Sequence, residues 1–394
     1  MSAEALAASF NVMAAAVALK SRIVEVRRHI HANPELSFQE TATARYVATI
    51  MSDLGYQVRL LSEKNGLIAE IGEGDNAVGI RADMDALPIQ EVSDRDYCSK
   101  NADVMHACGH DAHTACAVGA ATIIADLARQ GALPGKVRFL FQPAEESVNE
   151  QGLSGASLMM RQGAVDGLGA LFGLHVFPDV PSGFVAIQPG SFLAACDSFD
   201  LTIFGKGGHA ACPESTVDAV VISAQVIQAL QTIVARRKSP IKPAVLSIGG
   251  VKSNTFKSNI IADSVDLTGT VRYFDRDFYP FFFVVILCVC TFADFLCGCY
   301  SLDYALQLTE IVRAVGEKLL GAARVVCSGM HTGAEDFSFY TDKVPCCFFV
   351  LGVQMSDRPR QIHNAQFDVD EDALPIGTAM LTESALAFLQ RNLA

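Results

Sequence analysis

Short apolar runs alternate along the chain with segments that have helical periodicity. Four of these runs read as buried strands, at residues 77–82 (AVGIRA), 137–141 (VRFLF), 170–174 (ALFGL) and 347–351 (CFFVL). Amphipathic segments at 22–31, 41–54, 113–129 and 302–319 predict helices between and around them. Continuous apolar strands are typical of parallel sheets. The pattern therefore predicts an α/β fold with an open, mostly parallel sheet covered by helices.

The pattern changes near residue 191. Residues 192–210 read as strands, 215–237 as one long amphipathic helix, and 244–251 and 263–274 as two further strands. This order predicts a small α+β domain, residues 191–301, inserted into a discontinuous catalytic domain made of 1–190 and 302–394.

Residues 278–300 do not fit either pattern. Only Asp294 is charged in this 23-residue run, which also contains four cysteines. A buried segment, or an error in the gene model such as a frameshift, is the favoured interpretation. A membrane anchor is marginal by length and lacks basic flanks. A metal-binding knot would need a different cysteine spacing.

Length, charge and cysteine content narrow the class of protein. At 394 residues the chain is long for one core, and two domains are expected. The net charge of −13 argues against nucleic acid or an anionic membrane as the main partner. No basic residue precedes Lys20, so the first twenty residues read as an ordinary helix and not as a secretory signal. Twelve scattered cysteines favour reduced thiols and a cytoplasmic location.

Acidic and imidazole side chains follow each of the four predicted strands. The strands lead in turn to Asp83 with Asp85, to Glu145 with Glu146, to His175, and through a loop to His363. Because ligands bind beyond the carboxyl ends of strands in open α/β sheets, we expect these groups to share one edge.

The segment MHACGHDAHTA adds a thiol and an imidazole to this set. Gly109 lets the backbone turn so that Cys108 and His110 can reach one ion, and this donor pair suits zinc, cobalt, manganese or nickel. A buried cysteine beside a core histidine remains the alternative.

The adjacent residues Glu145 and Glu146 could have two different roles in catalysis. One carboxylate can bind metal while its neighbour serves as general base, although a solvated acidic turn has the same sequence. Taken together, the six donors predict a site for two divalent metal ions.

Three residues of the inserted domain are candidates for substrate contacts. His209 follows a glycine-rich turn and can donate to the oxygen of a tetrahedral intermediate, with a plain turn before a helix as the less favoured alternative. Asn259 and Arg272 can hold a substrate's carbonyl and carboxylate groups.

Seven motifs, RADMDALP, MHACGHDAHTA, QPAEE, GLHV, GKGGHAA, GTVR and GAEDFSFY, occur in this order. Together they resemble the aminoacylase, hippurate hydrolase and auxin-conjugate hydrolase group of metallo-amidohydrolases. The resemblance spans about residues 20–275 and 302–390. It implies a dinuclear zinc, manganese or cobalt site and an inserted lid domain that usually forms homodimers.

The resemblance also implies a role for each candidate residue. The implied metal ligands are Cys108, His110, Glu146, His175 and His363, with Cys108 in the bridging place. Glu145 is implied as the general base, and Asp83 as a carboxylate that orients a ligand. His209 is implied to reach a neighbouring subunit's active site, and Asn259 and Arg272 to contact substrate.

Two departures from the family pattern stand out. Glu214 replaces the histidine that usually follows the GGHAA-x-P stretch, which bears on the packing of the lid. Residues 278–300 replace an amphipathic helix and a polar strand.

The expected activity is hydrolysis of the amide bond of an N-acyl amino acid. A dipeptidase, a carboxypeptidase or a deacetylase of the same superfamily remains open, as does an inactive binding protein with a disrupted lid.

Overall fold

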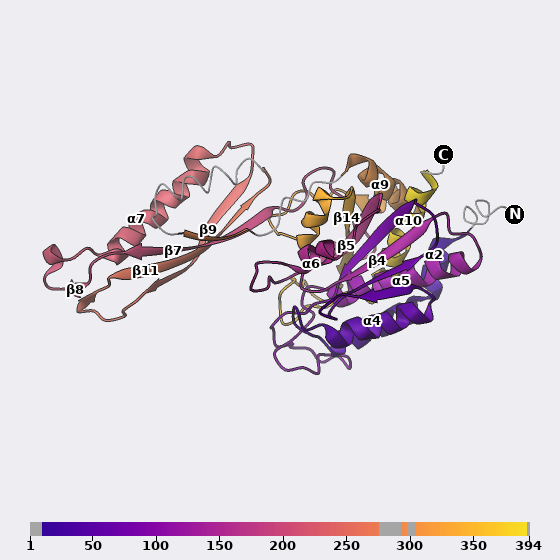
Figure 1. Cartoon of the computed structure of the whole chain (residues 1–394), viewed down its shortest axis with the longest axis horizontal. Coiled ribbons are helices and arrows are strands. Elements are labelled where there is room, and N and C mark those ends of the chain that lie inside the picture. Colours follow the sequence, from indigo (N-terminus) through magenta and orange to yellow (C-terminus); the bar gives the residue numbers. More distant parts are fainter. Residues whose placement is uncertain (1–9, 276–292, 298–304, 392–394) are drawn as a thin grey trace. The chain divides into compact units, whose positions relative to one another are not determined.

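The computed structural model describes residues 10–275, 293–297 and 305–391 (Figure 1). The chain divides into two compact units. The first comprises Met1–Gly190, Tyr304–Gly329 and Phe339–Ala394, and the second comprises Ser191–Asp303 and Met330–Ser338. We call them the catalytic unit and the lid unit.

The catalytic unit contains an eight-stranded sheet. Its strand order is β1-β2-β4-β3-β5-β14-β6-β13, and the four strands β4, β3, β5 and β14 at its centre run parallel. The strands are β1 (Gln57–Leu60), β2 (Leu67–Ile71), β3 (Ala77–Asp83), β4 (Lys136–Gln142), β5 (Ala170–Pro181), β6 (Val185–Ala186), β13 (Val325–Val326) and β14 (Cys346–Gln354). All seven residues of β3 are buried, as the continuous apolar run predicts.

Helices flank this sheet and bury its apolar side chains. They are α2 (Val12–Ala18), α3 (Lys20–Ala32), α4 (Thr41–Asp53), α5 (His110–Arg129), α6 (Gly155–Arg161), α9 (Leu306–Leu320) and α10 (Leu374–Arg391), with short 3₁₀ turns at Ala322–Arg324 and Glu371–Ala373 (η5). A third 3₁₀ turn, Asp336–Asp342, begins in the lid unit and ends in the catalytic unit. Helices α5 and α10 pack on β3 and β5, and α9 packs on β14. The predicted fold class is confirmed, and the four predicted central strands and four predicted helices are all present.

The lid unit contains a four-stranded antiparallel sheet covered by one helix (Figure 1). The sheet has the order β12-β7-β11-β9, with β7 (Ala195–Phe204), β9 (Ala244–Ser253), β11 (Ser264–Tyr273) and β12 (Ala293–Cys297). Helix α7 (Ala219–Thr232) packs its apolar face on this sheet. Two short strands, β8 (Gly208–His209) and β10 (Ile260–Ile261), pair with each other.

The lid helix is shorter than the predicted 215–237. Asp218 caps α7 by accepting hydrogen bonds from the amides of Val220 and Val221, while Val217 is held in a bridge to Lys206. The last turn, Ile233–Arg237 (η2), is a π-helix. The capping aspartate therefore determines where this helix begins, and the spacing of apolar residues is not sufficient to locate that position.

Residues 330–338 group with the lid unit, whereas the pattern of the sequence predicts that they belong to the catalytic domain. The amide of Ala194 donates to the carbonyls of His331 and Gly333, and the amide of His331 donates to the carbonyl of Phe192. These long-range backbone bonds tie the segment to the start of β7.

Most of the anomalous run 278–300 lies outside the described residues. Its described part is β12, which pairs antiparallel with β7 from Ala293↔Leu201 to Cys297↔Asp197. This stretch therefore forms an edge strand of the lid sheet.

The described residues bear on two further expectations. Reduced thiols are expected, and eight cysteines of the described residues are free thiols. One helical stretch, Ala219–Arg237, has the length and apolar composition to cross a membrane. A single stretch of this kind is weak evidence, because helices of water-soluble proteins pass the same test.

Candidate metal centre

The central strands deliver the candidate side chains to one edge of the sheet. Strands β4, β3, β5 and β14 are neighbours and run parallel, so their carboxyl ends point the same way. Glu145 follows β4, Asp83 ends β3, and His175 lies within β5. His363 lies in the loop after β14, where its amide donates to the carbonyl of Ala107 over 2.7 Å.

Gly109 makes the turn that places Cys108 and His110 together. Its φ of +93° is in the left-handed region, and it is the N-cap of α5, which begins at His110. A Cβ atom at this position would clash with the Val176 side chain. Glycine is therefore required both for the backbone conformation and for the close approach to β5.

The donors form two groups that share the Cys108 sulfur. Cys108, His110 and His175 form one group, and Cys108, Glu146 and His363 form the other; within each, the donor atoms lie within 4.8 Å of one another. Cys108 Sγ lies 3.4 Å from His175 Nε2, and His363 Nε2 lies 3.0 Å from Glu146 Oε1.

The two glutamates turn toward different histidines. Glu145 Oε2 lies 4.0 Å from His110 Nε2, whereas Glu146 faces His363. Both carboxylates also lie near His110, because His110, Glu145 and Glu146 form a further group of donor atoms within 4.8 Å of one another.

The hydrogen bonds leave the donor nitrogens available for a cation. Nδ1 of His110 faces Asp85 Oδ1 at 3.1 Å, and Nδ1 of His175 donates to the carbonyl of Val176 over 2.9 Å. His110 Nε2 is buried and has no hydrogen-bond partner among the described residues. Holding one imidazole nitrogen while the other faces the site is how proteins orient histidine ligands.

Burial changes the acid–base properties of these donors. Burial and the nearby Glu146 charge raise the pKa of the Cys108 thiol well above its usual value. Burial lowers the pKa of His175, which is therefore a neutral imidazole at pH 7. A thiolate in this setting needs a cation beside it. The donor set of one thiol, three imidazoles and two carboxylates fits two borderline-soft divalent metal ions.

Asp83 lies at the site, but the histidine to which it is hydrogen-bonded, His113, is not one of the candidate metal ligands. Its Oδ1 accepts from His113 Nδ1 over 2.7 Å and its Oδ2 accepts from Arg81 over 2.6 Å, while His110 Nε2 is 3.9 Å away. His113 Nε2 in turn accepts the amide of Val176 over 2.9 Å. Both nitrogens of His113 are therefore occupied, and His113 links Asp83 to the β5 backbone beside His175.

Asp85 also supports the site, although its place in the sequence predicts no separate role for it. Its two oxygens hold His110 Nδ1 and the amide of Glu146, the latter over 3.0 Å. The available signal was its place two residues after Asp83, which puts both side chains on the same side of an extended chain.

The lid candidates lie in two separate places. His209 in β8 pairs with Ile260 in β10, and the amide of Ala210 donates to the carbonyl of Asn259, so His209 and Asn259 are neighbours. Arg272 lies near the other end of β11, eight residues from Ser264, which is about 27 Å along a strand. The structure therefore does not bring Arg272 together with His209 and Asn259 within one chain.

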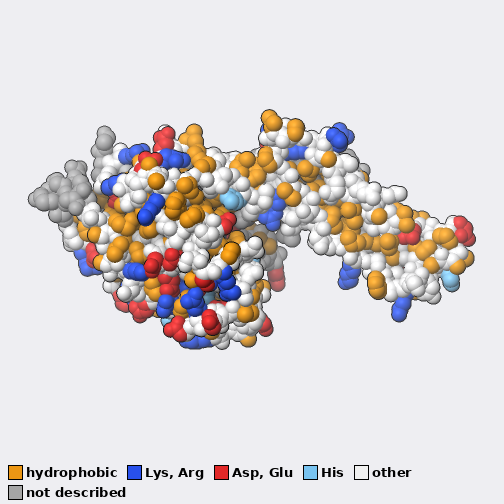
Figure 2. Space-filling view, turned by 180° about the vertical axis from the view of Figure 1, so that it is seen from behind, with side chains coloured by type: hydrophobic (Ala, Val, Ile, Leu, Met, Phe, Trp, Pro, Cys, Tyr) orange, Lys and Arg blue, Asp and Glu red, His pale blue; other side chains and the backbone are white. Residues whose placement is uncertain are grey.

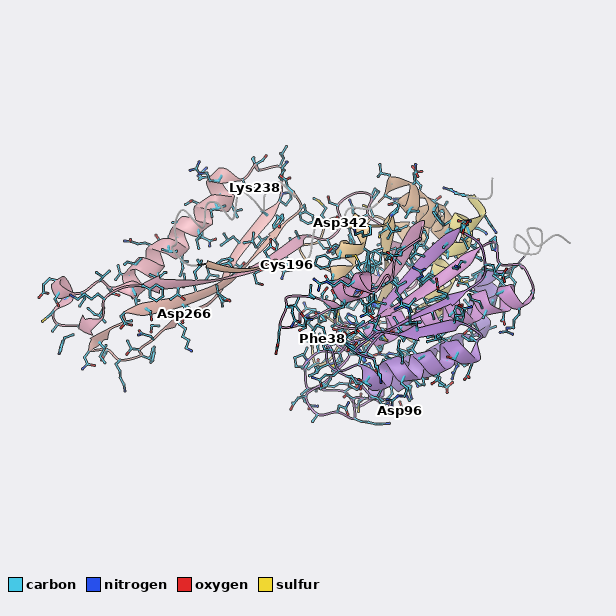
Figure 3. The ribbon with its side chains drawn as sticks, in the orientation of Figure 1. Phe38, Asp96, Cys196, Lys238, Asp266 and Asp342 are labelled. Atoms are coloured by element: carbon cyan, nitrogen blue, oxygen red, sulfur yellow. The ribbon has the colours of Figure 1, made fainter. Side chains whose placement is uncertain are left out.

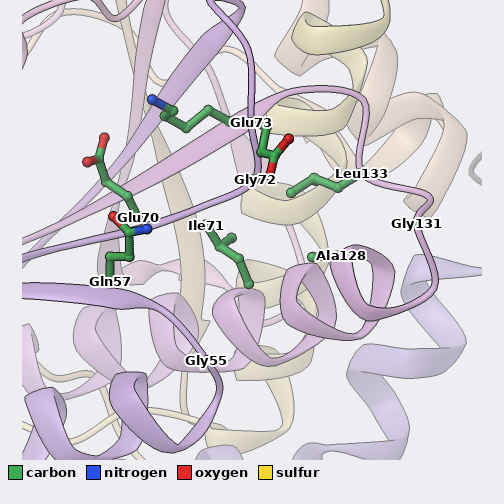
Figure 4. Close-up of a pocket in the computed structure, with 10 residues that line it drawn as sticks. Gly55, Gln57, Glu70, Ile71, Gly72, Glu73, Ala128, Gly131 and Leu133 are labelled. Atoms are coloured by element: carbon green, nitrogen blue, oxygen red, sulfur yellow. The ribbon is translucent and has the colours of Figure 1, made fainter.

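A cavity of about 560 Å³ elsewhere in the catalytic unit is separate from this site (Figure 4). Its lining includes Lys136, which begins β4, and Ala128, near the end of α5. Glu145 follows the opposite end of β4, and His110 lies at the opposite end of α5. The cavity therefore has no part in the metal centre.

Comparison with known proteins agrees with this geometry. The model of peptidase family M20/M25/M40 matches residues 79–387. The N-acetyl-L-cysteine deacetylase of Bacillus subtilis (strain 168) is 36% identical, over 95% of this chain and 90% of the relative. The IAA-amino acid hydrolase ILR1-like 2 of Arabidopsis thaliana is 35% identical, over 94% and 86%.

A solved structure shares the fold as well. The crystal structure of the Bacillus subtilis YXEP protein, described as a dinuclear metal binding peptidase from the M20 family, superposes with a TM-score of 0.79 at 31% identity. The alignment covers 95% of this chain and 99% of that chain. The resemblance inferred from the motifs is thus confirmed: this chain belongs to peptidase family M20/M25/M40, and it is a hydrolase.

Proposed function

We propose that this protein is a metal-dependent amidohydrolase that cleaves the amide bond of N-acyl amino acids, releasing a carboxylic acid and a free amino acid. The observation that carries the proposal is the pair of donor groups that share Cys108, with Glu145 beside them. The names of the two relatives, a deacetylase of an acetylated amino acid and a hydrolase of an amino-acid conjugate, support this substrate class.

The residues that would hold the metal ions are Cys108, His110, Glu146, His175 and His363. Thiolate and imidazole donors favour zinc, with manganese or cobalt as alternatives. When bound, two such ions would supply Lewis acidity to the water nucleophile and to the substrate carbonyl.

Glu145 is the proposed general base. Its carboxylate lies next to the donors without belonging to either group that contains Cys108. It would take a proton from the attacking water and return that proton to the nitrogen of the leaving amine. Asp85 would keep His110 oriented during this step, and Asp83 would act through His113.

His209 and Asn259 are proposed to bind substrate in the active site of a second subunit, and Arg272 to bind substrate separately from them. The separation of Arg272 from this pair within one chain supports that arrangement. The lid unit also exposes apolar side chains, among them Phe204, Val220, Val221 and Val251, as Figure 2 shows for one face. Exposed apolar groups of this kind support a homodimer or a higher homo-oligomer. The scattered cysteines support a cytoplasmic location.

Replacement of the base tests the function. Glu145→Gln should lower kcat by about 10²- to 10⁴-fold, the usual contribution of general acid–base catalysis, and should leave the metal content unchanged. The assay uses a panel of hippurate, N-acetyl amino acids, indoleacetyl conjugates and dipeptides with the zinc-, manganese- or cobalt-loaded protein.

Glu150→Gln is the matched control, because Glu150 is an exposed glutamate of the same loop. Full turnover by Glu145→Gln would contradict the assignment of Glu145 as the general base. If the wild-type protein cleaved dipeptides but no acylated amino acid, the substrate class would be rejected.

A further inference from the structure

Glu40 is a buried carboxyl group that the reaction described above does not use. It directly precedes α4, and its side chain is fully buried. Its Oε1 accepts hydrogen bonds from the amides of Phe38 over 3.0 Å and Ala144 over 2.7 Å. Figure 3 labels Phe38 in the loops at one end of the catalytic sheet. One oxygen atom thus joins a loop near the N-terminus to the residue before Glu145.

Both residues bound by Glu40 have a backbone conformation that is unusual for their type. Phe38 has φ +68° and Ala144 has φ +46°, and neither is glycine. L-residues with a Cβ atom rarely enter this left-handed region unless the surroundings hold them there. A shared acceptor for both amides is such a restraint.

Ala144 is held from its carbonyl side as well. Its oxygen accepts the amide of Gly155 over 2.9 Å. A Cβ atom at Gly155 would clash with the Pro143 oxygen, and one at Gly66 would lie 2.7 Å from Pro143 Cδ. Two glycines therefore let the chain close around the Pro143–Ala144 segment, and Glu40 supplies the polar contact inside that enclosure.

The conformation of Ala144 decides where Glu145 points, because the two residues are adjacent. Glu146 has its own anchor, since its amide donates to Asp85 Oδ2. We propose that Glu40 is a positioning residue of the hydrolytic reaction, which fixes the backbone of Ala144 and thereby aims the Glu145 carboxylate at the donor set. This inference rests on the proposed role of Glu145.

The neutral form of Glu40 suits this task. Burial, together with the charge of nearby Asp85, raises the pKa of Glu40 to about 8, even though the backbone amides that it accepts favour the charged form. A protonated carboxyl group still offers its carbonyl oxygen to both amides.

Asn65 provides a partner for the second oxygen of Glu40. Its Nδ2 lies 3.3 Å from Glu40 Oε2, and its Oδ1 is buried with no hydrogen-bond partner among the residues that the structure describes. A half-turn of the Asn65 amide would present that oxygen to a proton on Oε2 or to the amide of a glutamine.

Three substitutions at position 40 test the proposal on the full-length, metal-loaded protein. Glu40→Gln keeps the acceptor oxygen, Glu40→Asp withdraws it by one methylene group, and Glu40→Ala removes it. Glu35→Ala is the control, because the Glu35 side chain, among the described residues, bonds only to the first turn of α4, at Ala42 and Thr43.

Two readouts are measured for each variant. Steady-state kinetics with the best substrate of the panel should show kcat lowered about 100-fold in Glu40→Ala, and at least 10-fold in Glu40→Asp, with KM and metal content within about threefold of wild type. Glu40→Gln should stay within about threefold in kcat. Hydrogen–deuterium exchange at residues 143–146 should be faster in Glu40→Ala and Glu40→Asp and unchanged in Glu40→Gln.

The exchange measurement needs no substrate, so it distinguishes a failure of this inference from a failure of the proposed function. Unchanged exchange in both Glu40→Ala and Glu40→Asp would overturn the positioning role whatever the activity. So would a kcat that is as low in Glu40→Gln as in Glu40→Ala, or an equal loss of kcat in Glu35→Ala.

Discussion

Phe38, Ala144 and His363 adopt left-handed backbone conformations, although none of them is glycine. Ala144 directly precedes Glu145, His363 is a candidate ligand, and Phe38 shares the Glu40 acceptor with Ala144. Each such conformation costs about 1–2 kcal/mol for a residue with a Cβ atom. The amide of Phe38 has a local acceptor in Glu40, two residues away, whereas the amides of Ala144 and His363 have distant acceptors in Glu40 and in the carbonyl of Ala107. The tertiary structure therefore offsets local strain at the residues that direct Glu145 and His363.

The raised pKa of Glu40 predicts a pH-dependent difference in stability between wild type and Glu40→Gln. The unfolded carboxyl group titrates near 4.5 and the folded one near 8. Between these values the folded state holds one proton more than the unfolded state. The stability contributed by Glu40 is therefore complete below pH 4.5 and is lost as the pH rises toward 8.

Urea unfolding of both metal-free proteins at several pH values measures this difference. Relative to Glu40→Gln, the wild type should lose at most about 1.4 kcal/mol of unfolding free energy per pH unit in that window. A difference that does not change between pH 5 and pH 8 would show that Glu40 titrates normally in the folded protein.

At the scale of elements, a buried network of ion pairs joins α3 to the segment that follows His110 and to the segment that follows His363. Arg27 of α3 is fully buried and donates to Asp111 in the first turn of α5 over 2.7 Å, to Asp368 over 3.0 Å and to Glu371 of η5 over 3.1 Å. Asp111 follows His110 directly, and Asp368 lies five residues after His363. The network therefore holds two ligand-bearing segments in place.

Loss of Arg27 should destabilise the fold strongly. Arg27→Ala leaves buried carboxylates without their cation, which typically costs about 3–5 kcal/mol. Arg28→Ala is the control, because Arg28 also binds Glu371 but its side chain is 41% exposed, and its loss should cost at most about 1 kcal/mol. Equal denaturant midpoints for the two variants would contradict this ranking.

At the scale of the whole molecule, the proposed role of His209 predicts that each active site contains residues of two subunits. If His209 serves a neighbouring subunit, Glu145→Gln and His209→Ala homodimers should both be nearly inactive. Mixed dimers of the two variants should regain activity, because one of their two sites then has both an intact Glu145 and an intact His209.

Mixing the purified variants after reversible dissociation, followed by an activity assay, measures this complementation. Up to about a quarter of wild-type activity is expected, since random exchange makes half of the dimers mixed, each with one complete site. Each variant mixed with itself is the control. No recovery despite verified subunit exchange would place His209 in the site of its own chain or outside the reaction.

The sequence by itself determined the fold class and the set of candidate donors. Apolar runs and helical periodicity are local properties, and the carboxyl ends of parallel strands meet at one edge of a sheet, so the convergence of Glu145, His175 and His363 was predictable. The turn between Cys108 and His110 was likewise predictable, because Gly109 lies between them.

Only the tertiary structure decided which polar groups hold the others. Asp83 and Asp85 look equivalent in RADMDALP, yet Asp85 contacts His110 and Asp83 contacts His113. Ala144, one partner of Glu40, lies 104 residues away along the chain, and Glu371, one partner of Arg27, lies 344 residues away. Hydrogen bonds require donor and acceptor to meet within a few tenths of an ångström, and that meeting depends on how distant segments pack.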